Sequence, residues 1–207
     1  MKYIAFDVET TGFIAGIDQI VEISAIRFVD GKADGLFSTL VDPCIPIPQS
    51  ATNVSGIRDD MVQGKPTIDK LLEPFAEFCG SDLLVAHNAS FDYQFVTESI
   101  RKFESSAPKG LILDSCSISR KVFPGLLNYK LGTLVQHLKF KTEGLHRAEA
   151  DAFYCGQLFA AILNKVFMAN EPLSIEKLIA LSNNQALKFP QVIRAEKQLN
   201  FFDSLSI

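Results

Sequence analysis

The sequence has no long apolar run and no closely spaced cysteines. No uninterrupted hydrophobic stretch approaches the ~20 residues that a transmembrane helix needs, and the N-terminus has no apolar segment of the kind found in signal peptides. We therefore expect a cytoplasmic protein without a membrane partner. The four cysteines lie 35, 37 and 39 residues apart. This spacing lacks the Cys-x-x-Cys pairs of zinc sites and favours reduced, buried thiols over disulfides.

The negative charge is small overall and unevenly distributed. The formal net charge is −4, but residues 1–100 carry −9, residues 101–147 carry +6 and residues 148–207 carry −1. The middle segment can therefore supply a basic rim for a nucleic-acid partner. For most of its lysines and arginines, however, solvation of helix faces is the simpler explanation.

Hydrophobic patterns predict an α/β fold in a single domain with a C-terminal tail. A chain of 207 residues, 47% of them hydrophobic, can bury one sizeable core. Strand patterns followed by alternating helix and strand patterns predict a mixed β-sheet flanked by helices. The predicted strands are 2–8, 19–29, 36–41, 83–86 and 111–113, and the predicted helices are 67–79, 90–100, 131–138, 147–167 and 174–181.

Turn and cap residues predict several boundaries. Asp30-Gly31 is typical of a hairpin turn between the second and third strands. Ser90 and Ser174 are the expected N-caps of two helices. Pro172 predicts that the main domain ends near residue 168.

The chain then divides into a domain at 1–168 and a C-terminal helix with a tether at 169–207. Within the tether, the sequences Ser-Asn-Asn and Lys-Phe-Pro have no core pattern. We expect them to lie outside the core.

Five polar residues in three separate segments predict a metal site with its own proton acceptor. Asp7 and Glu9 are two residues apart at the end of the first strand, so both side chains project from one face. Asp92 lies near the start of a helix, and His146 precedes Asp151 by five residues. On a helix this separation is roughly 140° around the axis, which suits a histidine in the preceding loop and an aspartate one turn inside.

Carboxylate oxygens without a Cys/His cluster favour Mg²⁺ or Mn²⁺ over Zn²⁺. Two such ions can promote phosphodiester hydrolysis, with neutral His146 accepting a proton from the attacking water. Simpler alternatives exist for each residue alone. An Asp-x-Glu pair is often exposed at a strand edge, Asp92 can stabilise a helix N-terminus, and a lone histidine can cap or pack.

The segments Phe-Asp-Val-Glu-Thr-Thr-Gly, His-Asn-Ala-Ser-Phe-Asp-Tyr and His-Arg-Ala-Glu-Ala-Asp-Ala closely resemble the motifs of the DEDDh, or DnaQ-like, 3′ to 5′ exonucleases. This family includes the proofreading epsilon subunit of bacterial DNA polymerase III and ribonuclease T. The resemblance spans residues 1 to about 165 and implies a ribonuclease H-like mixed sheet. It implies that Asp7, Glu9 and Asp151 hold two metal ions, that Asp92 supports the second ion and that His146 is the general base.

The resemblance also implies contacts with the 3′-terminal nucleotide. The backbone groups that would face it belong to Thr10, Thr11 and Gly12. Asn88 and Phe91 match positions that line the substrate groove. Ser55 occupies a position where many members have a substrate-contacting histidine, so the resemblance leaves open whether Ser55 contacts the substrate.

Near the C-terminus, Gln198-Leu199-Asn200-Phe201-Phe202 resembles the pentapeptide with which bacterial replication proteins bind the sliding clamp. A short peptide with adjacent aromatic anchors suits a groove on a partner. The alternative is that Phe201 and Phe202 fold back on their own domain. In the first case Gln198, Leu199, Phe201 and Phe202 are the clamp-binding residues.

The leading hypothesis is a metal-dependent 3′ to 5′ exonuclease that releases nucleoside monophosphates from DNA ends in replication proofreading or repair, with a polymerase subunit as a further partner. An exoribonuclease of the ribonuclease T or oligoribonuclease type has the same motifs, because hydrolysis does not use the 2′-hydroxyl. An inactive nucleic-acid-binding module tethered to the clamp is an alternative from another class. All five site residues are of the expected type, which argues against loss of activity.

Overall fold

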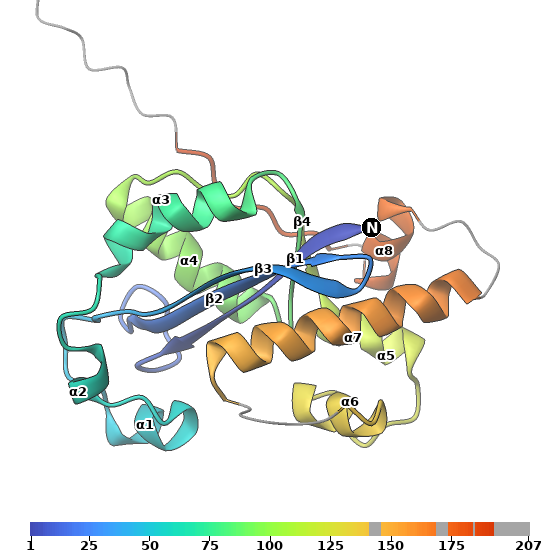
Figure 1. Cartoon of the computed structure of the whole chain (residues 1–207), viewed down its shortest axis with the longest axis horizontal. Helices are drawn as coiled ribbons and strands as arrows, with labels where there is room; N and C mark the ends of the chain where they lie inside the picture. The colour runs from blue at the N-terminus through green and yellow to red at the C-terminus, as the bar shows by residue number, and fades with distance from the viewer. Residues whose placement is uncertain (141–145, 169–173, 184, 193–207) are drawn as a thin grey trace, which may run out of the picture.

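A five-stranded mixed sheet forms the centre of the computed structural model, which describes residues 1–140, 146–168, 174–183 and 185–192 (Figure 1). The strand order is β3-β2-β1-β4-β5. β1, β2 and β3 pair antiparallel, whereas β1, β4 and β5 run parallel. The strands are β1 (Lys2–Thr10), β2 (Ile20–Val29), β3 (Lys32–Leu40), β4 (Leu83–Ala86) and β5 (Ile112–Asp114). The predicted mixed sheet is confirmed.

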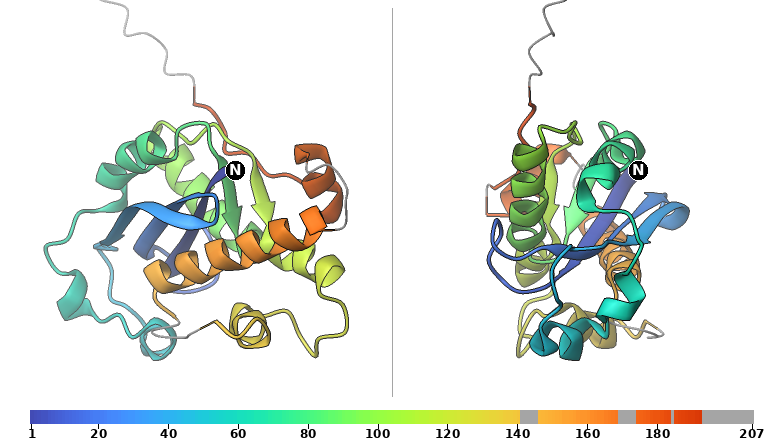
Figure 2. Two further views of the ribbon diagram at one scale, coloured as in Figure 1. Left: turned by 45° about the vertical axis from the view of Figure 1, so that its right-hand side comes forward. Right: turned by 90° about the vertical axis from the view of Figure 1, so that its left-hand side faces the viewer.

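Helices cover both faces of the sheet (Figures 1 and 2). One face packs against α3 and α4, and the other packs against α5, α6, α7 and α8. In the described residues no helix combines the length and the apolar character that a membrane span requires. The helices are α1 (Gln49–Ser55), α2 (Asp59–Val62), α3 (Ile68–Cys79), α4 (Ser90–Phe103), α5 (Ser115–Val122), α6 (Leu131–His137), α7 (Ala148–Met168) and α8 (Ile175–Leu181).

Alternate side chains of β1 face the two helical layers, as the period of a strand requires. One set packs with α3 and α4 and consists of Ile4, Phe6 and Val8. The other set begins with Tyr3 and Ala5, which pack with α7. Asp7 and Glu9 have the parity of this second set. Both carboxylates therefore emerge on the α7 side of the sheet, at the carboxyl end of β1.

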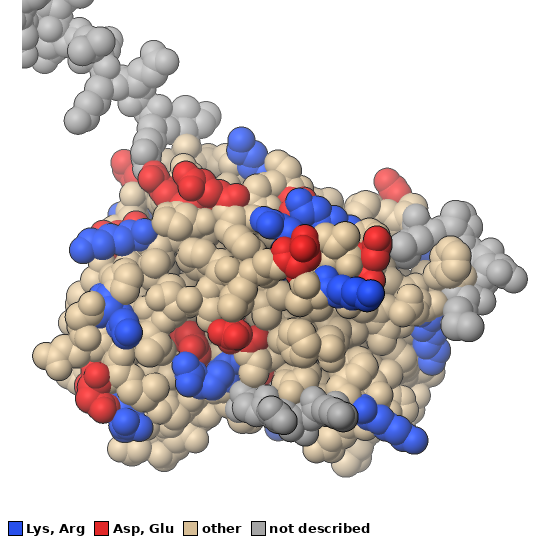
Figure 3. Space-filling model, viewed as in Figure 1, with Lys and Arg blue, Asp and Glu red and all other residues tan. Residues whose placement is uncertain are grey.

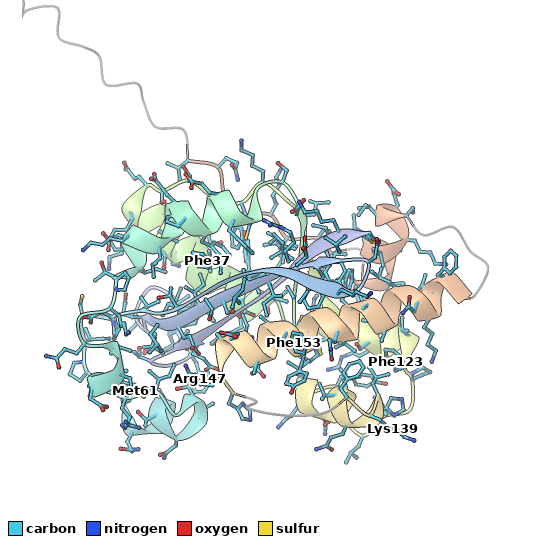
Figure 4. All side chains as sticks on the ribbon, viewed as in Figure 1. Phe37, Met61, Phe123, Lys139, Arg147 and Phe153 are labelled. Atoms are coloured by element: carbon cyan, nitrogen blue, oxygen red, sulfur yellow. The ribbon has the colours of Figure 1, made fainter. Side chains whose placement is uncertain are left out.

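Helix α7 can pack closely against the sheet because residue 156 is a glycine. A Cβ atom at Gly156 would lie 2.0 Å from the ring of Phe28. The Tyr3 hydroxyl donates a hydrogen bond to the Gly156 carbonyl over 2.9 Å, and the ring of Phe153 packs beside that of Phe28 (Figure 4). These contacts fix the depth of α7, and with it the position of Asp151 in its first turn.

The hairpin between β2 and β3 confirms the predicted turn. Asp30 and Gly31 both have positive φ values, 49° and 78°, as a two-residue type I′ turn requires. Val29 pairs directly with Lys32 across this turn. β3 therefore begins at Lys32, four residues before the predicted start at Leu36.

Several short helices and one cap differ from the prediction. α1, α2 and α5 were not predicted; they contain 7, 4 and 8 residues. Ser90 is wrong as an N-cap, because it is the first residue of α4 and makes no capping hydrogen bond at that helix. Ser174 is confirmed as the N-cap of α8, where its hydroxyl accepts from the Lys177 N–H over 3.2 Å.

The segment after α8 returns to the core, so the expected tether is wrong for Lys-Phe-Pro. Phe189 is buried and packs against the rings of Phe6 and Tyr93. Leu187 exchanges two backbone hydrogen bonds with Ile112 of β5, over 2.8 and 3.0 Å. The division at residue 168 remains a prediction, and the clamp-like residues 198–202 lie outside the described residues.

Candidate functional site

Three predicted metal ligands meet at the carboxyl end of β1. Asp7 and Glu9 come from β1, and Asp151 comes from the first turn of α7. One oxygen atom from each side chain lies within 4.8 Å of one from each of the others. All three carboxyl groups are partly exposed, so a ligand from solvent can reach them. Segments 144 residues apart in the sequence thus supply one acidic cluster.

Asp92 approaches the same strand from the opposite helical layer. It lies in the first turn of α4 and is only 2% exposed. Its Oδ1 accepts a hydrogen bond from the Val8 N–H over 3.0 Å. Because Val8 stands between Asp7 and Glu9, this bond fixes Asp92 next to both acids.

Burial and mutual repulsion raise the pKa of all four carboxyl groups. Burial is the largest cause for each. Burial, with the charges of Asp151 and Glu22, raises the pKa of Glu9 to about 7. Burial raises the pKa of Asp92 to about 8, although the Val8 hydrogen bond lowers it, and the pKa values of Asp7 and Asp151 are also raised.

Four clustered carboxyl groups that resist ionisation together fit a divalent cation. A cation supplies the positive charge that stabilises their ionised forms, and carboxylate oxygens are the ligands that Mg²⁺ and Mn²⁺ prefer. The donor set therefore suits the predicted metals.

His146 is in the loop before α7, as its five-residue separation from Asp151 predicted. Its side chain is exposed and its φ is +70°, a conformation uncommon outside glycine. Its backbone N–H points to Asp151 Oδ1 at 3.4 Å. The histidine is thus carried by a loop, whereas the aspartate is fixed on the helix.

Glu22 and Arg147 form an ion pair next to the acidic cluster that sequence reasoning missed; its carboxylate is buried and its guanidinium is partly exposed. Glu22 lies opposite Glu9 in the β1–β2 ladder and is 3% exposed. Arg147 donates to both carboxylate oxygens of Glu22, over 2.6 and 3.1 Å. Oppositely charged side chains adjoin where α7 begins (Figures 3 and 4). The available signal was a glutamate within a largely apolar strand.

The loop after β1 is organised by Asp18, a second residue that the sequence did not single out. One carboxylate oxygen accepts from the Ile14 N–H over 2.9 Å, and the other accepts from the Thr11 hydroxyl over 3.4 Å. A Cβ atom at Gly12 would lie 2.4 Å from this carboxylate. Glycine is therefore needed at position 12 for the close approach of Asp18.

A pocket of about 190 Å³ opens beside Glu9. Its wall includes the predicted nucleotide-facing residues Thr10, Thr11 and Gly12. Phe13 and Phe91 lie at this pocket with their rings in edge contact at 6.5 Å, and Phe13 is 83% exposed. α1 supplies the remaining wall, from Ser50, Ala51 and Val54. The pocket is thus largely apolar, with Glu9, a predicted metal ligand, at one side.

Two residues predicted to contact the substrate lie outside this pocket. Ser55 is buried, and its hydroxyl is engaged within the protein, donating to the Ala51 carbonyl and accepting from the Ile57 N–H, each over 3.2 Å. Asn88 is exposed and lines a different hollow near α6. The structure therefore brings Phe91 into the pocket, but not Ser55 or Asn88.

A mixed sheet whose central parallel strand ends in clustered carboxylates beside an open pocket is the arrangement of a nuclease that uses divalent metal ions. The chain belongs to the exonuclease family RNase T, whose sequence profile matches residues 4–159. This match confirms the resemblance inferred from the three motifs.

The relatives include domains of much larger polymerases. The chain is 34% identical over 202 residues to the PolC-type DNA polymerase III of Clostridium perfringens, and 38% identical over 150 residues to that of Listeria innocua. These matches cover 89% and 72% of this chain, but 14% and 10% of the polymerases. The chain thus spans only a small part of these relatives.

Solved structures share the fold. Exonuclease X in complex with 5′ overhanging duplex DNA is 27% identical, with a TM-score of 0.68; the match covers 87% of this chain and 99% of that one. E. coli Exonuclease I in complex with a dT13 oligonucleotide is 14% identical, with a TM-score of 0.71 and coverage of 82% and 42%. The second similarity shows the fold alone.

Proposed function

We propose that this chain is a 3′ to 5′ exonuclease that removes nucleoside monophosphates from DNA with two Mg²⁺ or Mn²⁺ ions. The observation that carries the proposal is the convergence of Asp7, Glu9 and Asp151 within 4.8 Å beside a pocket. The 27% identical Exonuclease X, whose structure contains duplex DNA, supports DNA as the substrate.

The four carboxylates would hold the metal ions. Asp7, Glu9 and Asp151 are the ligands, and Asp92 supports the second ion from behind β1. When bound, two divalent cations stabilise the attacking and leaving oxygens of an in-line displacement at phosphorus. The Val8 hydrogen bond keeps Asp92 oriented for this role.

His146 would accept the proton of the attacking water. Its exposed side chain and its place in a loop allow it to approach the substrate, and histidine titrates near neutral pH. Asp151, held in the first turn of α7, would be a metal ligand. In this proposal His146 transfers the proton and Asp151 binds the metal.

The pocket beside Glu9 would hold the terminal nucleotide. Backbone groups of Thr10 to Gly12 face the nucleotide, and Phe91 with Phe13 offers aromatic surface to its base. Stacking on aromatic rings tolerates any base, which suits an enzyme that shortens strands of any sequence.

The polymerase relatives support a cytoplasmic role in replication proofreading or DNA repair, with a polymerase subunit as partner. Clamp binding by Gln198 to Phe202 remains a sequence prediction. Binding of a purified clamp that persists after Phe201→Ala and Phe202→Ala together would contradict it.

A time course tests the proposal on single-stranded and 3′-extended duplex DNA, and on RNA of identical sequence, in Mg²⁺. We expect DNA to shorten from its 3′ end with release of mononucleotides, and Asp7→Ala to abolish this. Asp34→Ala, which removes an exposed acid on β3, is the matched control and should cleave normally.

Each other outcome has a defined meaning. Faster cleavage of RNA would favour the exoribonuclease alternative. Absence of any hydrolysis would favour the inactive binding module. Equal rates for Asp7→Ala and the unaltered chain would overturn the assignment of the acidic cluster.

A further inference from the structure

A second hollow, of about 450 Å³, opens at the carboxyl ends of β4 and β5. It is built by the loop after β4, by α5 and by the segment before α6. The residues that matter for its chemistry are His87, Asn88, Arg120, Asn128, Tyr129 and Lys130. This hollow is not part of the pocket beside Glu9.

Two unpaired cations line this hollow. Arg120 and Lys130 are both exposed, and neither has an ion pair within the described residues. The Arg120 guanidinium lies 4.9 Å from the centre of the Tyr129 ring, which orients it without neutralising its charge.

Three other basic residues of the positively charged segment are already engaged. Arg101 pairs with Glu98, Lys121 donates to the Ala180 carbonyl over 2.8 Å, and Arg147 pairs with Glu22. Lys102, Lys109 and Lys139 also have no ion pair among the described residues, but of the cations in this segment only Arg120 and Lys130 line the hollow.

The neighbouring acid does not cancel this charge. Asp114 accepts hydrogen bonds from the backbone N–H groups of Asn88, Ala89, Cys116 and Ser117, and from the Ser117 hydroxyl. Its carboxylate is thus turned to the protein backbone. These bonds also hold Asn88 at a φ of +66° with its side chain exposed.

His87 is a fixed part of the wall rather than a further charge. Its Nε2 lies 2.8 Å from the Tyr129 carbonyl and its Nδ1 lies 2.9 Å from the Ser115 hydroxyl. Burial lowers the pKa of His87, which keeps the ring neutral. The wall that presents Tyr129 and Lys130 is therefore held in place before any ligand binds.

The hollow and the nucleotide pocket share one edge of the molecule. α1, which lines the pocket, and the segment leading into α6, which lines the hollow, both lie along this edge (Figures 1 and 2). Asn88 lines the hollow and Phe91, three residues later, lines the pocket. A strand whose 3′ end occupies the pocket can therefore continue into the hollow.

We propose that this hollow binds backbone phosphates of the substrate strand on the 5′ side of the scissile bond. Arg120 and Lys130 neutralise the phosphates, and the side-chain amides of Asn88 and Asn128 can donate hydrogen bonds to phosphate or sugar oxygens. The inference rests on the proposed exonuclease function and adds the path of the strand.

The test compares strands that do and do not reach the hollow. We would measure kcat/KM for a dinucleotide and an eight-nucleotide single strand with the unaltered chain and with Arg120→Gln/Lys130→Gln. We expect the double variant to lower the ratio of the two kcat/KM values, long over short, about tenfold. The dependence of log KM on log salt should also flatten by about 0.7 for each phosphate that the variant no longer neutralises.

Two further variants make the result specific. Lys32→Gln/Lys70→Gln removes two exposed lysines from β3 and α3 and should keep the ratio. Arg120→Lys/Lys130→Arg keeps both charges and should retain most of the ratio of long-strand to short-strand kcat/KM. An unchanged ratio in Arg120→Gln/Lys130→Gln, or an equal loss in the lysine control, would overturn phosphate binding in the hollow. The proposed exonuclease activity would still stand. Absence of hydrolysis of both strands by the unaltered chain would instead overturn the proposed function itself.

Discussion

Arg147 is joined to Glu22 by two hydrogen bonds that span 125 residues of sequence. The same carboxylate accepts the N–H of Ala148, the first residue of α7, over 2.9 Å. Arg147 directly follows His146, so the pair fixes the point at which the loop becomes a helix. This contact thus helps to position both the proposed base and Asp151, together with the packing of α7 at Gly156.

Arg147→Met should therefore weaken both stability and catalysis. It leaves the buried Glu22 carboxylate without its cation, which we expect to cost about 1 to 3 kcal/mol in the free energy of unfolding. Urea unfolding measures this loss, and kcat should fall while KM changes less. Arg58→Met, which removes an exposed pair with Asp60, should change neither; a similar loss in both variants would contradict the special role of Arg147.

His146→Ala should lower kcat by about 10² to 10⁴ if the imidazole accepts the proton of water. KM should change little, because His146 does not line the nucleotide pocket. Steady-state kinetics on a single-stranded oligonucleotide gives both values. His137→Ala, on the exposed side of α6, is the control, and a kcat for His146→Ala within twofold of the unaltered chain would exclude the general-base role.

Asp92→Asn distinguishes a role of Asp92 in metal binding from a role in stabilising the start of α4. Asparagine keeps an oxygen that can accept the Val8 N–H, so the fold should survive, but the negative charge is lost. We expect activity to fall roughly 10- to 100-fold and to recover partly at high Mg²⁺. Retention of full activity at low Mg²⁺ would show that Asp92 serves the start of α4 alone.

Gly12→Ala should disturb the nucleotide pocket while sparing the core. The new Cβ would meet the Asp18 carboxylate at 2.4 Å, so the loop that follows Thr10 must shift. We expect a rise in KM of about tenfold with little change in melting temperature, because the loop is largely exposed. A melting temperature that falls in proportion to activity would point to general unfolding instead.

Stability in the absence of metal should fall as the pH rises. The folded-state pKa values of Glu9, about 7, and Asp92, about 8, lie above those of the unfolded chain. The folded state therefore holds these protons more tightly, and stability is lost between about pH 4 and pH 8 as they dissociate. Thermal unfolding in EDTA at pH 5.5 and pH 8 measures the difference.

Mg²⁺ should reverse this loss at pH 8, because a ligand of the folded state raises its melting temperature. The gain should be smaller at pH 5.5, where protons compete for the carboxylates. Asp7→Asn should abolish most of the gain and Asp34→Asn should retain it. Equal Mg²⁺ effects on these two variants would contradict metal binding at the acidic cluster.

The sequence predicted those parts of the site that local patterns determine. The two-residue period of β1 placed Asp7 and Glu9 on one face, and the spacing of His146 and Asp151 separated a loop residue from a helix residue. Each prediction needed only the geometry of a strand or of one helical turn. The positive φ values at Asp30 and Gly31 were likewise implied by the residue types.

Contacts between distant segments could not be predicted in the same way. Nothing near Glu22 indicates Arg147, and nothing near Phe189 indicates Phe6. The short helices α1, α2 and α5 also lacked a signal, because 4 to 8 residues contain too few turns for an apolar period. Ser55 illustrates a further limit: its motif position suggested substrate, whereas its hydroxyl completes a helix end.

The burial of Phe189 fixes the place of the last described residues in the fold. Gln191 donates to the carbonyl of Pro108, which precedes β5 and lies at the amino end of that strand. The acidic cluster lies at the carboxyl end of the parallel strand β1. The last described residues, 185–192, therefore lie at the end of the sheet opposite the acidic cluster, away from the proposed site of hydrolysis.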